Sequence, residues 1–135
     1  MLGSIISDIK TALANAGVTN VYSAFDALRT DKKGDFFSVV GISGFETNTP
    51  VYSHYYIFIP FRATAEISVT APEKFPLERL YSYYDENIMP VINSLSGLTA
   101  HVSGLTIKHD TNINRLVLNV KFHLTGMKKI ERENI

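Results

Sequence analysis

Apolar and polar positions alternate along residues 51–70, and this stretch dominates the hydrophobic pattern of the chain. Its odd positions are apolar except Ser53. Its even positions are mostly aromatic in the first half and mostly polar in the second half, and they include Tyr52, His54, Tyr56, Phe58, Arg62, Thr64, Glu66, Ser68 and Thr70. Because successive strand residues point to opposite faces, the pattern predicts one long strand, or two strands joined at Pro60. The first half would then be apolar on both faces and would need a cover on each.

Periodic patterns on either side of this stretch predict two helices and three more strands. Helical spacing of apolar residues marks the two helices, and β-rich or alternating runs mark the strands. Pro90 lies inside the second helix, where it removes a hydrogen bond, so we expect a kink or a break near Asn87. The predicted segments are helix 2–17, strand 36–43, helix 76–97, strand 101–108 and strand 116–124.

The order of predicted elements is therefore helix, strand, strand, helix, strand, strand. We expect an α+β fold in which a mixed or antiparallel sheet of about four strands carries two helices packed on one face. The length predicts a single domain over residues 1–135. The charged segment 127–135 is expected to be a frayed, flexible C-terminal tail or an arm held by a neighbour.

Composition and charge exclude several classes of partner. The chain has 13 basic and 13 acidic residues, mixed along its length, so it lacks the concentrated basic surface of nucleic-acid or anionic-membrane binding. It contains no cysteine, which excludes a disulfide framework, a thiol nucleophile and a thiolate metal site. No apolar run approaches the roughly 18 residues that cross a bilayer. We expect a soluble, intracellular domain with no specific nucleic-acid partner and no membrane partner.

The sequence contains no recognisable catalytic or cofactor-binding pattern. Its four histidines do not pair at the spacings of a metal site, and the one adjacent His–carboxylate pair, His109–Asp110, falls in a predicted turn. The glycine-rich nucleotide loops and the hydrolase nucleophile motif are absent. We therefore expect no catalytic residues, no cofactor and no metal, and we do not expect an enzyme.

The surplus of apolar surface in the first half of the long strand is the feature most informative about function. We expect the aromatic positions to lie at or near a subunit interface and two charged residues to pair at its rim. In the alternative, the N-terminal segment covers this face within one chain. A rival of another class is a small ligand-binding or enzymatic α+β domain with a hydrophobic pocket between sheet and helix. The interface candidates are Tyr52, His54, Tyr56 and Phe58, with Arg62 and Glu66 at the rim.

Three stretches carry a resemblance to a known family. They are FFSVVGISGFETNTPVYSHYYIFIPFRATAEISVTAPE, PLERLYSYYDENIMPVINSLSGL and TIKHDTNINRLVLNVKFHLTG. Together they resemble the tail-terminator and tail-completion proteins of long-tailed phages and prophages of Gram-positive bacteria. The resemblance implies a virion assembly protein that forms a hexameric ring, caps the tail tube and docks to the head–tail connector. It also implies that the protein is made in the cytoplasm of the host bacterium and is then incorporated in the virion.

Overall fold

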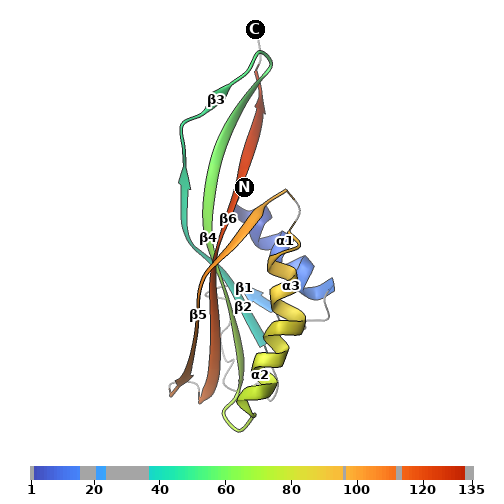
Figure 1. Cartoon of the computed structure of the whole chain (residues 1–135), viewed down its shortest axis with the longest axis vertical. Helices are drawn as coiled ribbons and strands as arrows, with labels where there is room; N and C mark the ends of the chain where they lie inside the picture. Colours follow the sequence, from blue (N-terminus) through green and yellow to red (C-terminus); the bar gives the residue numbers. More distant parts are fainter. Residues whose placement is uncertain (1, 16–20, 24–36, 96, 112–113, 133–135) are drawn as a thin grey trace.

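The computed structural model describes residues 2–15, 21–23, 37–95, 97–111 and 114–132. The molecule is elongated, with a wider lower body and a narrow β-ribbon that projects from it (Figure 1). In chain order the elements are α1 Leu2–Asn15, β1 Val21–Ser23, β2 Phe37–Thr47, β3 Val51–Tyr52, β4 Tyr56–Pro72, α2 Leu77–Tyr83, the π-helical η2 Tyr84–Ile88, α3 Met89–Ile92, β5 Thr99–Asp110 and β6 Arg115–Glu131.

The sheet differs from the one the sequence predicts. Among the described residues it has six strands in the order β1-β2-β4-β6-β5, with β3 pairing to β4, and every pair except the parallel β1–β2 is antiparallel. The predicted fold class, about four strands with two helices packed on one face, is wrong. Strands β4 and β6 have 17 residues each and α1 has 14. A strand of that length extends about 56 Å and such a helix about 21 Å, so short helices leave much of the sheet uncovered.

The core lies between the lower half of the sheet and the helices. Alternate residues on one face of β4 and β6 are fully buried, as the period of a strand requires, and they pack against apolar side chains of α1 and of the helical segment 77–92. The fully buried side chains include Ile9, Leu13, Ile67, Leu80, Ile88, Ile92, Leu118, Phe122 and Leu124. Burying each such side chain stabilises the fold by about 1.5–3 kcal/mol.

The helical segment 77–92 contains the irregularity expected from its proline. Pro76 is the N-cap of α2, and the five residues Tyr84–Ile88 form the π-helical turn η2 immediately before α3, whose second residue is Pro90. A proline has no N–H to donate and its ring crowds the preceding turn. The wider turn of a π-helix relieves this conflict without ending the helix.

The predicted long strand is interrupted near its start. The chain reverses at residues 53–55, so β3 folds back onto β4 with Val51 opposite Phe58. The Ser53 side chain closes this turn, because its Oγ donates to Tyr56 O at 3.1 Å and accepts from Tyr56 N–H at 3.2 Å. The single strand predicted from Val51 is therefore wrong before Tyr56.

Pro60 lies inside β4, which is a central strand and not an edge. Its carbonyl accepts a hydrogen bond from Asn48 N–H at 2.9 Å, in the interval between the end of β2 at Thr47 and the start of β3 at Val51. In an antiparallel sheet, the backbone N and O of one residue point toward the same neighbouring strand. The nitrogen of Pro60, which carries no hydrogen, therefore points toward residues 48–50, where no strand is paired with β4. A proline is therefore tolerated in the middle of the sheet.

Strand β6 continues through residues that the sequence assigns to a tail. It pairs with β4 as far as Glu131, opposite Tyr56, and Arg132 N–H donates to Tyr55 O at 2.7 Å. Residues 127–131 are thus part of the sheet, whereas residues 133–135 lie outside the described chain.

Candidate functional site

The projecting ribbon is the most distinctive surface of the molecule. We call the ribbon formed by residues 43–60 and 125–132 the β-arm. Strand β5 begins at Thr99, opposite Thr125. Beyond that point the sheet narrows to β2 or β3, β4 and β6, and among the described residues no helix lies beside its upper part (Figure 1). Within the described chain, neither face of the upper part of the β-arm is therefore covered by a helix.

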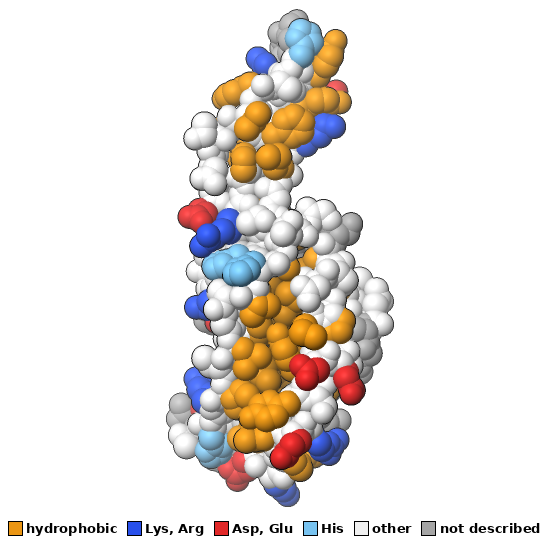
Figure 2. Space-filling model, in the orientation of Figure 1, with side chains coloured by type: hydrophobic (Ala, Val, Ile, Leu, Met, Phe, Trp, Pro, Cys, Tyr) orange, Lys and Arg blue, Asp and Glu red, His pale blue; other side chains and the backbone are white. Residues whose placement is uncertain are grey.

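Large apolar side chains are exposed along the β-arm. Val51 is 52% exposed, Tyr52 65%, Tyr55 63% and Met127 59%. Apolar side chains gather on the upper part of the surface, where β3 and the ends of β4 and β6 lie (Figure 2). An exposed group of aromatic and aliphatic side chains on an ordered ribbon is typical of a protein interface.

Basic side chains accompany these rings. Lys129 Nζ lies 3.8 Å from the centroid of the Tyr56 ring, and the Arg132 guanidinium lies 5.7 Å from that of Tyr52. Arg132 also donates to Ser53 O at 2.8 Å. These contacts connect the end of β6 to the turn of the β3–β4 hairpin and give the β-arm a basic, aromatic tip.

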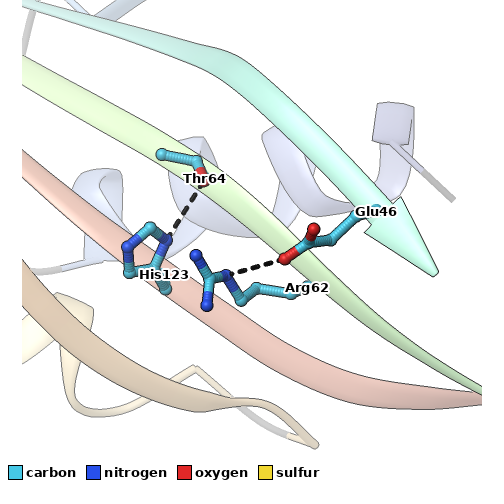
Figure 3. A network of polar contacts seen from close by, with 4 residues as sticks. All are labelled: Glu46, Arg62, Thr64 and His123. Carbon is cyan, nitrogen blue, oxygen red and sulfur yellow. Dashed lines mark hydrogen bonds and ion pairs between the residues drawn. The ribbon is translucent and has the colours of Figure 1, made fainter. Parts of the chain in front are cut away.

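A polar band separates the β-arm from the body. Arg62 Nε lies 3.2 Å from Glu46 Oε1, and Thr64 Oγ1 lies 3.1 Å from His123 Nδ1 (Figure 3). These pairs bridge β2 to β4 and β4 to β6. The ion pair between Arg62 and Glu46 is exposed, so it contributes at most about 1 kcal/mol to stability.

The sequence-based interface candidates are distributed over this region. Tyr52, His54, Tyr56 and Phe58 all belong to the β-arm, and the rings of Tyr56 and Phe58 lie 6.1 Å apart. Tyr52 is paired with Ile57, so its side chain lies on the opposite face of the β-arm from Tyr56 and Phe58. Within the turn, the ring centroids of His54 and Tyr55 lie 4.4 Å apart.

The two rim candidates lie in the body below the β-arm. Arg62 pairs with Glu46, and Glu66 lies opposite Gly41 and Lys121 in the strand register. Their assignment to the rim of an interface stays a prediction.

Sequence reasoning missed Lys129 and Arg132, because it assigned the charged C-terminal residues to a tail. The available signal was the strand alternation of 116–124, which continues past Gly126 through Lys128 and Ile130 on the face shared with Leu124.

A second exposed apolar surface lies on the helical segment 77–92. Leu77, Tyr81 and Met89 are each 40–45% exposed. Acidic residues lie beside them at Glu78, Asp85 and Glu86, all of them exposed. Burial raises the pKa of the Tyr84 phenol above its ordinary value, and the Asp85 carboxylate raises it further, so this ring stays neutral at physiological pH. We call the surface formed by the exposed apolar and acidic side chains of segment 77–92 the helix face.

The described residues show where the histidines and the core side chains lie. They contain no group of three or more His, Asp or Glu side chains that could hold a metal. His109 Nε2 contacts Glu73 Oε2 at 2.9 Å, an exposed pair that differs from the adjacent pair seen in the sequence. Leu80 and Phe122 belong to the core between sheet and helix, the region where the rival hypothesis placed a ligand pocket, and that hypothesis stays untested.

Comparisons with known proteins give similarity to solved structures alone. No protein-family model matches the chain, and no curated protein matches it. A crystal structure of the type 4 fimbrial biogenesis protein PilO from Pseudomonas aeruginosa matches with 12% identity and a TM-score of 0.35, over 94% of this chain and 69% of that one. The core region of PilO from the same pilus system matches with 17% identity and a TM-score of 0.27, over 79% and 91%. A protein from Akkermansia muciniphila matches with 11% identity and a TM-score of 0.41, over 98% and 53%.

These matches contradict the phage assignment. The named structures are pilus biogenesis proteins and not phage tail proteins. The tail-terminator family, the capping of a tail tube, the docking to a connector and the location in a virion are therefore wrong. At these identities and TM-scores the similarity gives this chain no function of its own. In the part of the chain that the structure describes, no helix combines the length and hydropathy needed to cross a membrane.

Proposed function

We propose that this chain is a self-associating structural subunit and that the β-arm is the surface through which it docks onto another copy. The observation that carries the proposal is the exposed apolar and aromatic surface of an ordered ribbon that projects beyond the body. The role is one of assembly and not of catalysis.

The hydrogen bonds that fix the conformation of the β-arm support a docking role. Its strands pair along their length, and Asn48, Ser53 and Arg132 make hydrogen bonds that close the hairpin and its end. A preorganised ribbon loses little conformational entropy when it binds, so its exposed side chains contribute more of their burial energy to affinity.

The amount of apolar surface also supports an interface. Complete burial of an aromatic or aliphatic side chain contributes about 1.5–3 kcal/mol, and a side chain that is already half covered contributes about half of that. Four large apolar side chains of the described β-arm are more than half exposed. Their burial could supply several kcal/mol toward association.

The test replaces exposed apolar side chains of the β-arm while keeping the propensity for strand. Tyr52→Thr combined with Met127→Thr removes two of the most exposed side chains, one on each face. Analytical ultracentrifugation of the double variant should show self-association weakened by at least about tenfold.

A matched control makes the same kind of change in the body. Val102→Thr with Leu105→Thr alters two exposed apolar side chains of β5. This control should associate like the wild type, with both double variants keeping the wild-type circular dichroism. Equal association of all three proteins would contradict the proposal.

A further inference from the structure

We infer that the surface receiving the β-arm is the helix face of a second copy, so that copies associate head to tail. This inference rests on the proposed function and specifies the partner surface. It is carried by the opposite charge and shared apolar character of two surfaces at opposite ends of one molecule.

The charges of the two surfaces are complementary although the whole chain is neutral. Among the described residues at the end of β6, the β-arm carries three basic residues, Lys128, Lys129 and Arg132, and one acidic residue, Glu131. The helical segment 77–92 carries the reverse, three acidic residues against the single basic Arg79, whose guanidinium lies 4.7 Å from the Phe75 ring centroid. Opposite potentials on two surfaces favour their encounter and fix their relative orientation.

Both surfaces also combine these charges with exposed apolar side chains. On the helix face Leu77 and Tyr81 are one helical turn apart, and Met89 lies two turns further on. Acidic side chains border the lower apolar surface on the side of α2 (Figure 2). A shallow hollow on the same segment is lined by Glu78, Arg79, Ser82, Tyr83, Glu86 and Asn87. The stem of a lysine could pack in such a hollow while its ammonium group reaches the carboxylates.

The two surfaces cannot meet within one chain. The tip of the β-arm and helix α2 lie at opposite ends of the elongated molecule (Figure 1). Contact between them therefore needs two copies, and it joins different surfaces of each copy. Such a heterologous contact leaves one β-arm and one helix face free, so association continues into a ring or an open chain, depending on the rotation between copies.

The experiment reverses the charges of each surface separately. One protein carries Lys128→Glu and Lys129→Glu, and the other carries Glu78→Lys and Glu86→Lys. Multi-angle light scattering at low ionic strength should show that each protein alone has lost association by about tenfold or more. An equimolar mixture should regain it, because every β-arm then has a complementary helix face available.

Controls separate the charge effect from unfolding. Lys129 contacts the Tyr56 ring, so the arm variant is compared with Lys128→Gln, which leaves that contact intact and should weaken association in the same direction. Reversal of two exposed charges elsewhere, Asp8→Lys and Lys108→Glu, should leave the mass unchanged.

The outcomes distinguish this inference from the proposed function. Loss of association in the arm variant but not in the helix variant would overturn the head-to-tail contact and leave the β-arm as the docking surface, as in pairing of two arms. Wild-type association in both variants would contradict the proposed docking as well as this inference. A mixture that stays monomeric would also overturn the head-to-tail contact.

Discussion

At the residue scale, Arg115 is the side chain that most needs hydrogen bonds from its neighbours, because it is a charged group buried in the sheet. Arg115 is 1% exposed, its Nε donates to Thr70 Oγ1 at 3.0 Å and its guanidinium donates to Thr70 O at 3.3 Å. Removing a charge from water is costly unless hydrogen bonds compensate it. Thr70 is therefore part of the support of a buried charge and does not serve simply to fill space in β4.

We expect Thr70→Val to destabilise the fold by about 1–3 kcal/mol, because it removes a hydrogen-bond acceptor from a buried guanidinium while nearly preserving side-chain volume. Urea unfolding measures the change in the free energy of unfolding. Thr106→Val, at an exposed position of β5, is the control and should change it by less than about 0.5 kcal/mol. Equal effects of the two substitutions would contradict the support assigned to Thr70.

Burial of Arg115 could not be predicted from its sequence position. It immediately precedes an alternating strand, and the alternation assigns it to the polar, solvent-facing side. The same alternation placed Leu118, Phe122 and Leu124 correctly on the core face. A periodic pattern identifies faces, but it does not identify which part of a polar face is covered by another segment.

At the scale of elements, the junction between body and β-arm depends on close packing around a glycine. A Cβ added at Gly126 would lie 2.8 Å from Leu98 Cδ2 and 3.0 Å from Phe61 Cζ. The Phe61 ring also stacks on Phe45, with centroids 5.8 Å apart. A side chain at position 126 would therefore have to displace the Leu98 side chain and crowd the Phe61 ring where β6 leaves the body.

We expect Gly126→Ala to lower the free energy of unfolding by about 1–3 kcal/mol through overpacking. Thermal and urea unfolding would measure it, and adding Leu98→Ala should recover part of the loss by making room for the new methyl group. Gly104→Ala is the matched control in β5, since a Cβ there meets no atom within 4 Å. A junction that tolerates both substitutions equally would contradict this packing role.

Sequence patterns located the helices and the main strands better than they located the turns. Helix α1 and the start of α2 after Pro76 lie where spacing and proline predict them. The reversal at Ser53 was missed because a serine side chain closes it, without the glycine or proline that usually signals a hairpin. The aromatic residues of the β-arm were recognised as a group, but its basic residues were missed because a charged chain end resembles a tail.

At the scale of the whole molecule, a net charge of zero conceals a difference in charge between the basic end of β6 and the acidic helical segment 77–92. Composition gives the net charge, but it cannot reveal how the charges are distributed in space. The acidic residues 78, 85 and 86 lie in the helix that the sequence predicts, whereas the basic residues at the end of β6 belong to the β-arm only in the structure.

We therefore expect self-association to weaken as ionic strength rises. The Debye length shortens from about 30 Å at 0.01 M salt to about 10 Å at 0.1 M, which screens attraction between exposed charges. Sedimentation at both salt concentrations should give the larger assemblies at the lower one. The Lys128→Glu, Lys129→Glu variant should lose this dependence or reverse it.

The most direct test of the central claim is the solution mass of the wild-type chain, measured by light scattering on a size-exclusion column over a series of concentrations. The account predicts a species heavier than the 15.1 kDa monomer that loses mass on dilution. A mass of 15.1 kDa at every concentration, at low as well as moderate salt, would contradict self-association through the β-arm.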